Sequence, residues 1–482
     1  MTDRPAGRWW AVGAAVAVTA LALLTWLVTS GMLPQRVVVP LVGASWLVFA
    51  GAVRLVLRAP RRTAIALILL GGVVLPVLAA SAPPRSSDDL YRYVWDGRVQ
   101  AAGVDPYAHP PADPALRGLR DGFLWPADAP WCLPDGTCTR INRPTVPTIY
   151  PPVAQAYFLG VHVLSPAGSR TRPVQLAAAL IAAATALLLV RALPRFGLNP
   201  RWAALWAWCP TVFLEAGNNA HVDVLATFLA AAALTTLAGG GVLAGRSGRG
   251  RAVWGGVLLG LAVAVKLTPG LLAPALLRRR PVLVALAAAG TVVLGYLPHM
   301  WAVGADVLGY IPGYLTEEGY ASGQRFALLT LVLPVVWAPV AAGVVLVAAA
   351  GWTALRADPD RPWDAAVTMV GTALLVATPG YSWYALLLVV LVALSGRGEW
   401  LAVAAAGHLA LYAADLHLAP ATGQRLGYGL ALVAVIAVAV RRQTRRGSPR
   451  GAEGVGPGWS LRWPPPDQVS GVRANTPGKD RP

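Results

Sequence analysis

The residues best suited to carry chemistry lie in one short stretch, Ser87 to Arg98, which reads SDDLYRYVWDGR. It contains the adjacent aspartates Asp88 and Asp89 and, further along, the arginines Arg92 and Arg98. A carboxylate that is partly withdrawn from water beside a like charge holds a proton more readily, which suits a general base. The arginines could keep such a carboxylate ionised or bind an anionic substrate. Alternatively, the aspartates only cap a helix, and Arg92 only helps to hold the loop together.

A second candidate is Lys266, one of two lysines in the sequence. It lies in an apolar run, where a cation costs about 2.5–3.5 kcal/mol even on the gentler insertion scales. A buried ammonium therefore needs an anionic partner, and the phosphate of a substrate would supply one. A helix break at Thr268 and Pro269 would add backbone groups to such a site. The alternatives are that the lysine reaches the membrane surface, or that it pairs with Glu215 or Asp223.

A polar cluster separates two apolar runs and comprises Glu215, Asn218, Asn219, His221 and Asp223. These side chains are too polar to face lipid, so we expect them to line the same cavity and to contact a polar ligand there, such as a sugar. His221 and Asp223 could orient a sugar by hydrogen bonding or assist the movement of a proton. We expect no metal, because a hard cation requires more converging oxygen ligands.

Trp383 and Tyr384 follow Pro379 and Gly380, at another break between apolar runs. Their rings could pack on the face of a sugar. Aromatic side chains at such a depth are also typical anchors at the membrane surface, so both interpretations stay open.

Cys132 and Cys138 flank the sequence LPDGT, in which Pro-Asp-Gly favours a tight turn. Both lie in a segment that we expect outside the cytoplasm, where disulfides persist. We therefore expect a disulfide between them.

The elements that position these residues must belong to a membrane protein. Hydrophobic residues make up 56% of the 482 positions and charged residues only 13%, which excludes a soluble globular chain. The formal charge of +18 does not indicate nucleic-acid binding, because the arginines are scattered in short clusters between apolar runs. Such clusters mark cytoplasmic loops. The sequence predicts an all-α polytopic membrane protein with both termini in the cytoplasm.

The apolar runs divide the chain into four parts. Residues 1–80 hold three spans, 81–173 form a large outer loop with short surface helices, 174–440 hold the other spans, and 441–482 form a disordered basic cytoplasmic tail. Because several runs are shorter than the roughly 20 residues of a full span, we expect about 12–14 transmembrane or re-entrant helices. The expected runs are Trp9–Ser30, Val37–Leu57, Thr63–Ala80, Val174–Val190, Trp202–Leu214, Val222–Leu237, Val253–Val265, Leu267–Leu277, Val282–Leu297, Phe326–Ala350, Ala365–Thr378, Trp383–Leu394, Leu401–Leu418 and Leu426–Val440.

Two segments of the outer loop carry a family resemblance, SDDLYRYVWDGRVQAAGVDPY at residues 87–107 and INRPTVPTIYPPVAQ at residues 141–155. They resemble the first outer loop of bacterial integral-membrane glycosyltransferases of the GT-C superfamily, most closely the polyprenol-phosphate-mannose-dependent mannosyltransferases of glycosyltransferase family 87. The resemblance extends to residues 208–226, 264–277 and 378–388, and it implies a GT-C-like fold.

The resemblance implies an enzyme that transfers a sugar, mannose in that family, from a polyprenyl-monophosphate lipid to an acceptor hydroxyl with inversion. The acceptor would be a glycolipid or glycan on the outer face of the cytoplasmic membrane, and we expect no cofactor. The aspartate of the first loop serves as the base, a role that falls to Asp89 or Asp88. Lys266 would bind the donor phosphate together with the arginines of the loop, and Tyr150 would line the cavity.

Two other functions stay open from the sequence. Intramembrane Lys, His and Asp with broken helices are also typical of a transporter or flippase for a lipid or a solute. The polar groups gather at the outer ends of helices, however, and not at the midplane, which favours the enzyme. A GT-C transferase for another polyprenyl-phosphate sugar, such as arabinose, would share the architecture.

Overall fold

The computed structural model describes residues 5–239, 247–276 and 278–447. These residues are mostly helical, and their strands are one short antiparallel pair, β1 (Trp131–Cys132) and β2 (Cys138–Thr139). Seven helical runs in this part of the chain are long and apolar enough to cross a membrane. The prediction of an all-α polytopic membrane protein is thus confirmed. The long helices are α1 (Pro5–Thr29), α2 (Gln35–Val56), α3 (Arg61–Ala79), α6 (Arg172–Ala192), α11 (Pro281–Val303), α13 (Ala338–Arg356) and α17 (Pro420–Gly447).

Shorter helices lie between these long ones, and several predicted spans correspond to them. They are α4 (Asp89–Ala101), α5 (Pro152–Leu164), α7 (Ala204–Ala207), α8 (Asp223–Leu237), α9 (Gly248–Val263), α10 (Ala273–Leu276), α12 (Ile311–Glu317), α14 (Trp363–Ala377), α15 (Leu386–Ser395) and α16 (Leu401–Leu411).

Proline accounts for the breaks in two of the predicted spans. The run expected at Trp202–Leu214 consists of η3 (Pro200–Ala203), α7 and the π-helix η4 (Val212–Asn218), because Pro210 has no N–H to continue the helical ladder. The run expected at Phe326–Ala350 becomes α-helical only at α13, after Pro334 and two short 3-10 turns, η7 (Leu329–Leu331) and η8 (Val335–Trp337).

The first residues of the tail predicted from residue 441 are helical. The helix α17 continues to Gly447. The rest of the predicted tail, residues 448–482, lies outside the described residues.

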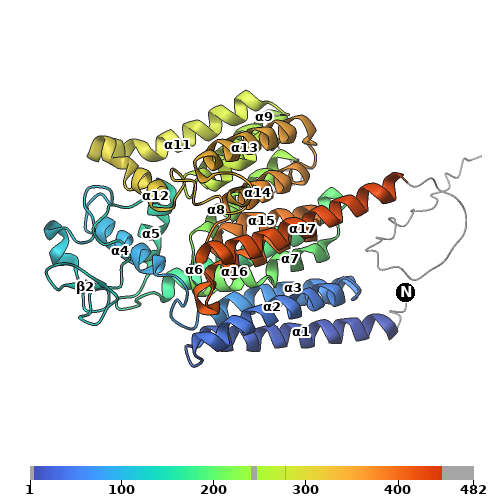
Figure 1. The fold of residues 1–482 in the computed structure, drawn as a ribbon, viewed down its shortest axis with the longest axis horizontal. Coiled ribbons are helices and arrows are strands. Elements are labelled where there is room, and N and C mark those ends of the chain that lie inside the picture. The colour runs from blue at the N-terminus through green and yellow to red at the C-terminus, as the bar shows by residue number, and fades with distance from the viewer. Residues whose placement is uncertain (1–4, 240–246, 277, 448–482) are drawn as a thin grey trace, which may run out of the picture. The chain divides into compact units, whose positions relative to one another are not determined.

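The centre of the helical core is α15, in which every side chain from Leu386 to Ser395 is buried. A helix that is apolar on all sides must be enclosed by other helices. It packs against α7, α8, α14 and α16 (Figure 1). The long helix α11 instead exposes Leu286, Leu294 and other apolar side chains, as expected of a helix that faces lipid.

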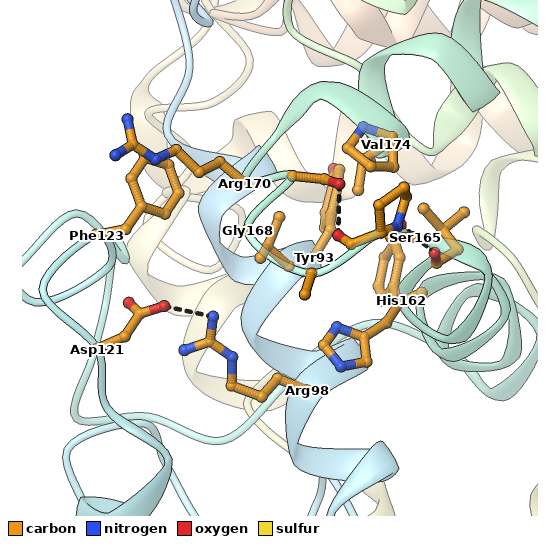
Figure 2. Close-up of a pocket in the computed structure, with 16 residues that line it drawn as sticks. Tyr93, Arg98, Asp121, Phe123, His162, Ser165, Gly168, Arg170 and Val174 are labelled. Atoms are coloured by element: carbon orange, nitrogen blue, oxygen red, sulfur yellow. Dashed lines mark hydrogen bonds and ion pairs between the residues drawn. The ribbon is translucent and has the colours of Figure 1, made fainter.

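The chain between α3 and α6, residues 80–171, folds into a unit that we call the α3–α6 segment. It contains α4, a 3-10 turn η1 (Pro114–Leu119), the β1–β2 hairpin and α5. A disulfide joins Cys132 to Cys138 across the hairpin. Arg98 of α4 donates a 2.6 Å hydrogen bond to Asp121 and so ties the chain before the hairpin to the helix (Figure 2).

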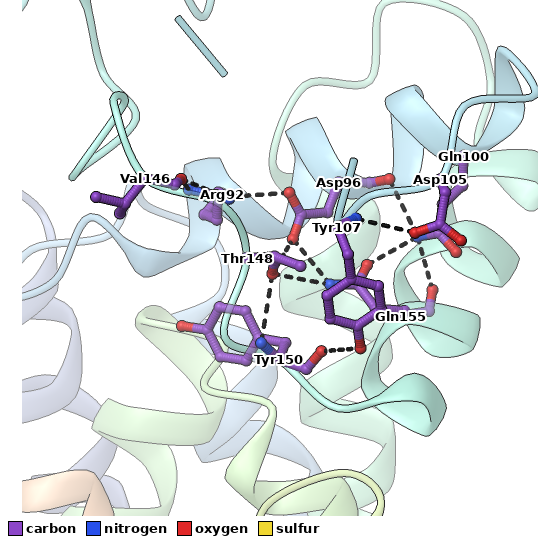
Figure 3. A network of polar contacts seen from close by, with 9 residues as sticks. All are labelled: Arg92, Asp96, Gln100, Asp105, Tyr107, Val146, Thr148, Tyr150 and Gln155. Atoms are coloured by element: carbon purple, nitrogen blue, oxygen red, sulfur yellow. Dashed lines mark hydrogen bonds and ion pairs between the residues drawn. The ribbon is translucent and has the colours of Figure 1, made fainter. Parts of the chain in front are cut away.

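A buried polar network fixes α4 against the chain that enters α5 (Figure 3). Arg92 Nε donates to Asp96 Oδ1 at 2.8 Å, and its two terminal nitrogens donate to the carbonyl oxygen of Val146 at 3.2 Å. The other oxygen of Asp96 accepts hydrogen bonds from Thr148 Oγ1 at 2.7 Å and from Gln155 Nε2 at 3.0 Å. Since a buried charge is stable only when it is paired and hydrogen-bonded, this network holds α4 and residues 146–155 in one arrangement.

The helices α4 and α5 approach closely at Gly97. A β-carbon at this position would lie 2.5 Å from the carbonyl oxygen of Phe158 and 3.1 Å from Cβ of His162. No side chain fits in that space, so the contact requires glycine.

We expect the Gly97→Ala variant to lose stability, because the methyl group would push α5 away from α4 at a cost of about 1–3 kcal/mol. The midpoint of thermal unfolding of the purified protein in detergent should fall. Gly122→Ala is the matched control in the same segment, since a β-carbon there meets nothing within 4 Å. Equal unfolding temperatures for the two variants would contradict the close packing of α4 on α5.

Candidate active site

One cavity of about 490 Å³ collects most of the candidate residues. It lies where the start of α4 meets residues 142–150, Lys266, α12 and the turn that leads into η9 (Ser382–Ala385). The residues singled out in the sequence that line it are Asp88, Asp89, Arg92, Tyr150, Lys266, Trp383 and Tyr384.

Asp89 is the first residue of α4 and is contacted from two sides. Its Oδ1 accepts a 2.7 Å hydrogen bond from Asn142 Nδ2. Its Oδ2 lies 3.7 Å from Nδ1 of His221, which is fully buried, and no described residue donates a hydrogen bond to this oxygen. The bond from Asn142 therefore orients the carboxylate, while one oxygen is left to act on a ligand in the cavity.

Asp88 immediately precedes α4 and has a different partner. Its Oδ2 accepts a 3.1 Å hydrogen bond from Trp131 Nε1 in β1, and its side chain does not cap the helix. Burial raises the pKa of Asp88, the Trp131 hydrogen bond and the charge of Arg140 oppose this, and the charge of Asp89 reinforces it. The aspartate pair is thus divided between the hairpin, which holds Asp88, and the protein interior, which Asp89 faces.

Lys266 pairs with Asp223, one of the alternatives that the sequence left open. The distance from Lys266 Nζ to Asp223 Oδ2 is 3.2 Å. The ammonium also lies 5.6 Å and 5.7 Å from the ring centres of Tyr150 and Tyr384, contacts that stabilise a cation. Because the lysine side chain is still 17% exposed and lines the cavity, an anionic ligand can reach it.

The polar cluster predicted to contact the sugar lies behind the cavity wall. His221 Nε2 is 3.6 Å from Glu215 Oε2, and Glu215 also accepts hydrogen bonds from Asn219 Nδ2 at 2.9 Å and from Ser382 Oγ at 2.5 Å. All of these side chains are buried. Glu215, Asn219, His221 and Asp223 do not line the cavity; they support the residues that do. No group of three or more His, Cys, Asp or Glu in the described part of the chain is arranged to hold a metal ion.

Stacked aromatic rings form one wall of the cavity. The ring of Trp383 stacks between the His221 imidazole, 3.9 Å away at 19°, and the Tyr381 ring, 4.5 Å away at 16°. Tyr384 continues the wall, and its hydroxyl lies 2.5 Å from the hydroxyl of Tyr314 in α12. Such a wall presents apolar ring faces beside the charged groups, a surface on which the carbon face of a sugar can pack.

Two arginine–glutamate pairs join α12 and the residue after it, which line the cavity, to other parts of the fold. Arg143 makes a two-pronged contact with Glu317, with nitrogen–oxygen distances of 2.6–3.0 Å. Arg325 pairs with Glu318, and both of these side chains are buried to more than nine-tenths. The rim opposite Asp89 is thus fixed by paired charges and not by apolar packing alone.

The structure places Arg92 and Arg98, the arginines predicted to bind the donor phosphate, in different surroundings. The guanidinium of Arg92 is occupied by Asp96 and the Val146 carbonyl. Arg98 lies on the far side of α4, does not line the cavity, and is bonded to Asp121. The reason is helical phase, because residues nine positions apart, such as Asp89 and Arg98, lie on opposite faces of an α-helix.

Several residues without a predicted role complete the cavity, chiefly Asn142, Arg143 and Tyr314. Asn142 and Arg143 belong to the sequence INRP, within the segment that carries the resemblance, so their polar side chains were a signal. Tyr314 belongs to α12, and its place in the cavity follows from how α12 packs.

The comparison with known families agrees with this geometry. Residues 148–379 match the family model of glycosyltransferase family 87. The match covers just under half of the chain and indicates a membrane glycosyltransferase. The matched part of the glycosyltransferase includes Tyr150, Lys266 and the buried cluster from Glu215 to Asp223, while the aspartate pair precedes it. The match favours an enzyme over a transporter or flippase. Searches of curated proteins and of solved structures find no match to the chain.

Replacing Arg92 by methionine tests whether this residue serves the fold of the glycosyltransferase. The change would leave Asp96 buried without its counter-charge, and removing one partner of a buried ion pair costs about 3–5 kcal/mol. We expect a clear fall in the thermal unfolding midpoint in detergent. Arg117→Met, at an exposed position in η1, should change stability by no more than about 0.5 kcal/mol. An unchanged midpoint for Arg92→Met would contradict a structural role.

Proposed function

We propose that this glycosyltransferase moves mannose from a polyprenyl-monophosphate donor to a hydroxyl of a glycolipid or glycan acceptor, with inversion at the anomeric carbon. The observation that carries the proposal is that an oriented carboxylate, Asp89, and a cation within the apolar region, Lys266, line the same cavity. A general base and a phosphate-binding cation are the two groups that this displacement requires.

In the proposed reaction Asp89 acts as the general base. Its Oδ2 accepts the proton of the acceptor hydroxyl as that oxygen forms a bond to the anomeric carbon. The bond from the anomeric carbon to the phosphate oxygen breaks, and its electron pair leaves with the phosphate. Because negative charge grows on the phosphate during this step, a fixed cation at Lys266 stabilises the transition state more than the ground state.

The surroundings of the aspartate pair support Asp89 over Asp88 as the base. Asn142 orients Asp89 and leaves its Oδ2 without a donor among the described residues, whereas the Oδ2 of Asp88 accepts a bond from Trp131. His221 lies behind Asp89, 3.7 Å from its carboxylate, and Glu215 lies 3.6 Å from His221 on the other side. These polar neighbours suit a carboxylate that gains and loses a proton.

An apolar groove near Lys266 suits the polyprenyl chain of the donor. It measures about 350 Å³, lies between α9 and α11, and is lined only by apolar side chains and glycines. Val263 and Gly270, which flank Lys266 in the sequence, both line it. A lipid held there would place its phosphate near the lysine while its chain stays in the apolar region.

We further propose that the cavity opens to the outer face of the cytoplasmic membrane, with both termini in the cytoplasm. The arginine clusters support this orientation. Arg61 and Arg62 begin α3 and Arg191 ends α6, and these three arginines lie at the ends remote from the α3–α6 segment, as the positive-inside rule expects of cytoplasmic ends. Arg172 lies at the opposite end of α6. A lipid-linked donor, and not a nucleotide sugar, is the natural sugar source on the outer face. No cofactor is part of the proposal.

Asp89→Asn should lower the rate of sugar transfer about a hundred- to ten-thousand-fold, because it removes the general base without changing the size of the side chain. Transfer is measured with the purified protein, a polyprenyl-phosphate sugar and an acceptor, and donor binding is measured separately and should persist. Asp88→Asn is the matched control and should retain most of the activity. Normal turnover by Asp89→Asn, or a larger loss in Asp88→Asn, would refute the assignment.

Lys266→Gln should lower kcat/KM for the donor about a hundred- to a thousand-fold, the effect expected when a preorganised charge on the leaving group is lost. The double variant Lys266→Gln with Asp223→Asn separates two explanations. If Lys266 only neutralises Asp223, removal of both charges restores activity. We expect no restoration, since the phosphate would still lack its cation.

A further inference from the structure

The face of α4 that points away from Asp89 borders two adjoining cavities outside the active site. They measure about 570 and 700 Å³ and share Phe123 and Gly168–Arg170 in their walls (Figure 2). Tyr91, Val94 and Arg98 of α4 line them, and helical geometry places these positions opposite Asp89. We call the two cavities together the arginine cleft. Its charged lining residues are Arg98, Arg140, Arg170, Arg172 and Asp121.

Three of the four arginines in the arginine cleft form no ion pair with a described carboxylate, and one of them, Arg172, donates to the carbonyl oxygen of Ala80. The single carboxylate of the cleft, Asp121, is used by Arg98 at 2.6 Å, and no other carboxylate of the described residues forms an ion pair with Arg140 or Arg170. Their guanidinium carbons lie 5.4 Å and 5.1 Å from the ring centre of Phe123. The Nε of Arg140 is buried without a hydrogen-bond partner in the described structure. The arginine cleft therefore holds more positive charge than its own residues neutralise.

The backbone adds to this positive charge. The helix α6 begins at Arg172, and its first residues line the arginine cleft. The side chain of the preceding Thr171 makes no capping bond, and no acidic residue lies in the first turn. The N-terminus of a helix carries a partial positive charge, which favours an anion.

The arginine cleft lies at the border of an apolar surface. The end of α5 exposes Val163 to 67% and Leu164 to 86%, and α6 exposes Leu176 to 44% and Leu180 to 62%. Since α6 is one of the helices long and apolar enough to cross a membrane, these side chains face lipid. The start of α6 is then at the depth of the lipid headgroups.

We propose that the arginine cleft binds the phosphate of an anionic membrane phospholipid, at a site separate from the active-site cavity. A guanidinium group can donate paired hydrogen bonds to the oxygens of a phosphate. Arg140 and Arg170 have N–H donors for such bonds, because neither forms an ion pair with a described carboxylate. The apolar surface of Val163, Leu164 and Leu180 supports acyl chains, so the ligand is a lipid and not a free phosphate. A lipid held here fixes the depth of the α3–α6 segment at the membrane surface, and with it the depth of Asp89 at the start of α4.

Native mass spectrometry of the full-length protein in a non-ionic detergent tests this site. The protein is titrated with dioleoyl phosphatidylglycerol and, in parallel, with dioleoyl phosphatidylcholine of the same chain length. We expect the first phosphatidylglycerol to bind at least about tenfold more tightly. Arg140→Gln with Arg170→Gln should weaken its binding about 10- to 30-fold, as expected for two arginines that each contribute about three- to fivefold at an anionic lipid surface.

The controls separate this site from folding defects and from catalysis. Arg140→Lys with Arg170→Lys keeps both charges and should keep the preference for phosphatidylglycerol, as should Arg117→Gln at an exposed arginine outside the cleft. Asp89→Asn should bind the lipid normally, so failure of the proposed base and failure of this site are distinct results. Any of three results would overturn the proposal. These are equal binding of the two lipids, binding of phosphatidylglycerol by the double glutamine variant as tight as that by the unchanged protein, and displacement of the bound lipid by glycerol phosphate as effective as displacement by the intact lipid.

Discussion

The buried ion pair between Arg92 and Asp96 is the constraint on which the candidate site depends. Both side chains are almost fully withdrawn from solvent, where an unpaired charge would be prohibitively costly. Thr148, Gln155 and the Val146 carbonyl satisfy the remaining hydrogen bonds and so bind residues 146–155 to α4. This single unit carries the proposed base at the start of α4, and Tyr150, which faces Lys266, in the attached chain.

The helix α4 therefore separates two environments. One face presents Asp89 to a cavity that meets Lys266 and the stacked rings around Trp383, and the opposite face presents Arg98 to the arginine cleft. A water-soluble transferase could place its base on any rigid loop. An enzyme with a lipid-linked donor must also set the height of its base relative to the bilayer, and a helix held by polar contacts on both faces meets that need.

Sequence patterns predicted the features that depend on local chemistry. Apolar runs indicated the membrane helices, and the cost of an isolated cation predicted that Lys266 needs an anion, of which Asp223 was a named candidate. The roles of Arg92 and Arg98 could not be predicted, because they depend on helical phase and on partners up to 54 positions away, as in the bond from Arg92 to Val146. The stacking of His221 on Trp383 likewise arises only when η4 and η9 meet in the fold. Pro210 and Pro334 indicate helix breaks in the sequence itself. The arrangement of the resulting short helices and their neighbours around a buried α15 depends on tertiary packing and could not be predicted from the sequence.

The central claim, transfer with inversion from a lipid phosphate, is tested most directly by the configuration of the product. The purified glycosyltransferase in lipid nanodiscs is given a polyprenyl-phosphate mannose of known anomeric configuration and a glycolipid acceptor, and the new linkage is examined by nuclear magnetic resonance. The account predicts a glycosidic bond of the opposite anomeric configuration. A bond of retained configuration, or a donor that is consumed without forming any glycosidic bond, would contradict it.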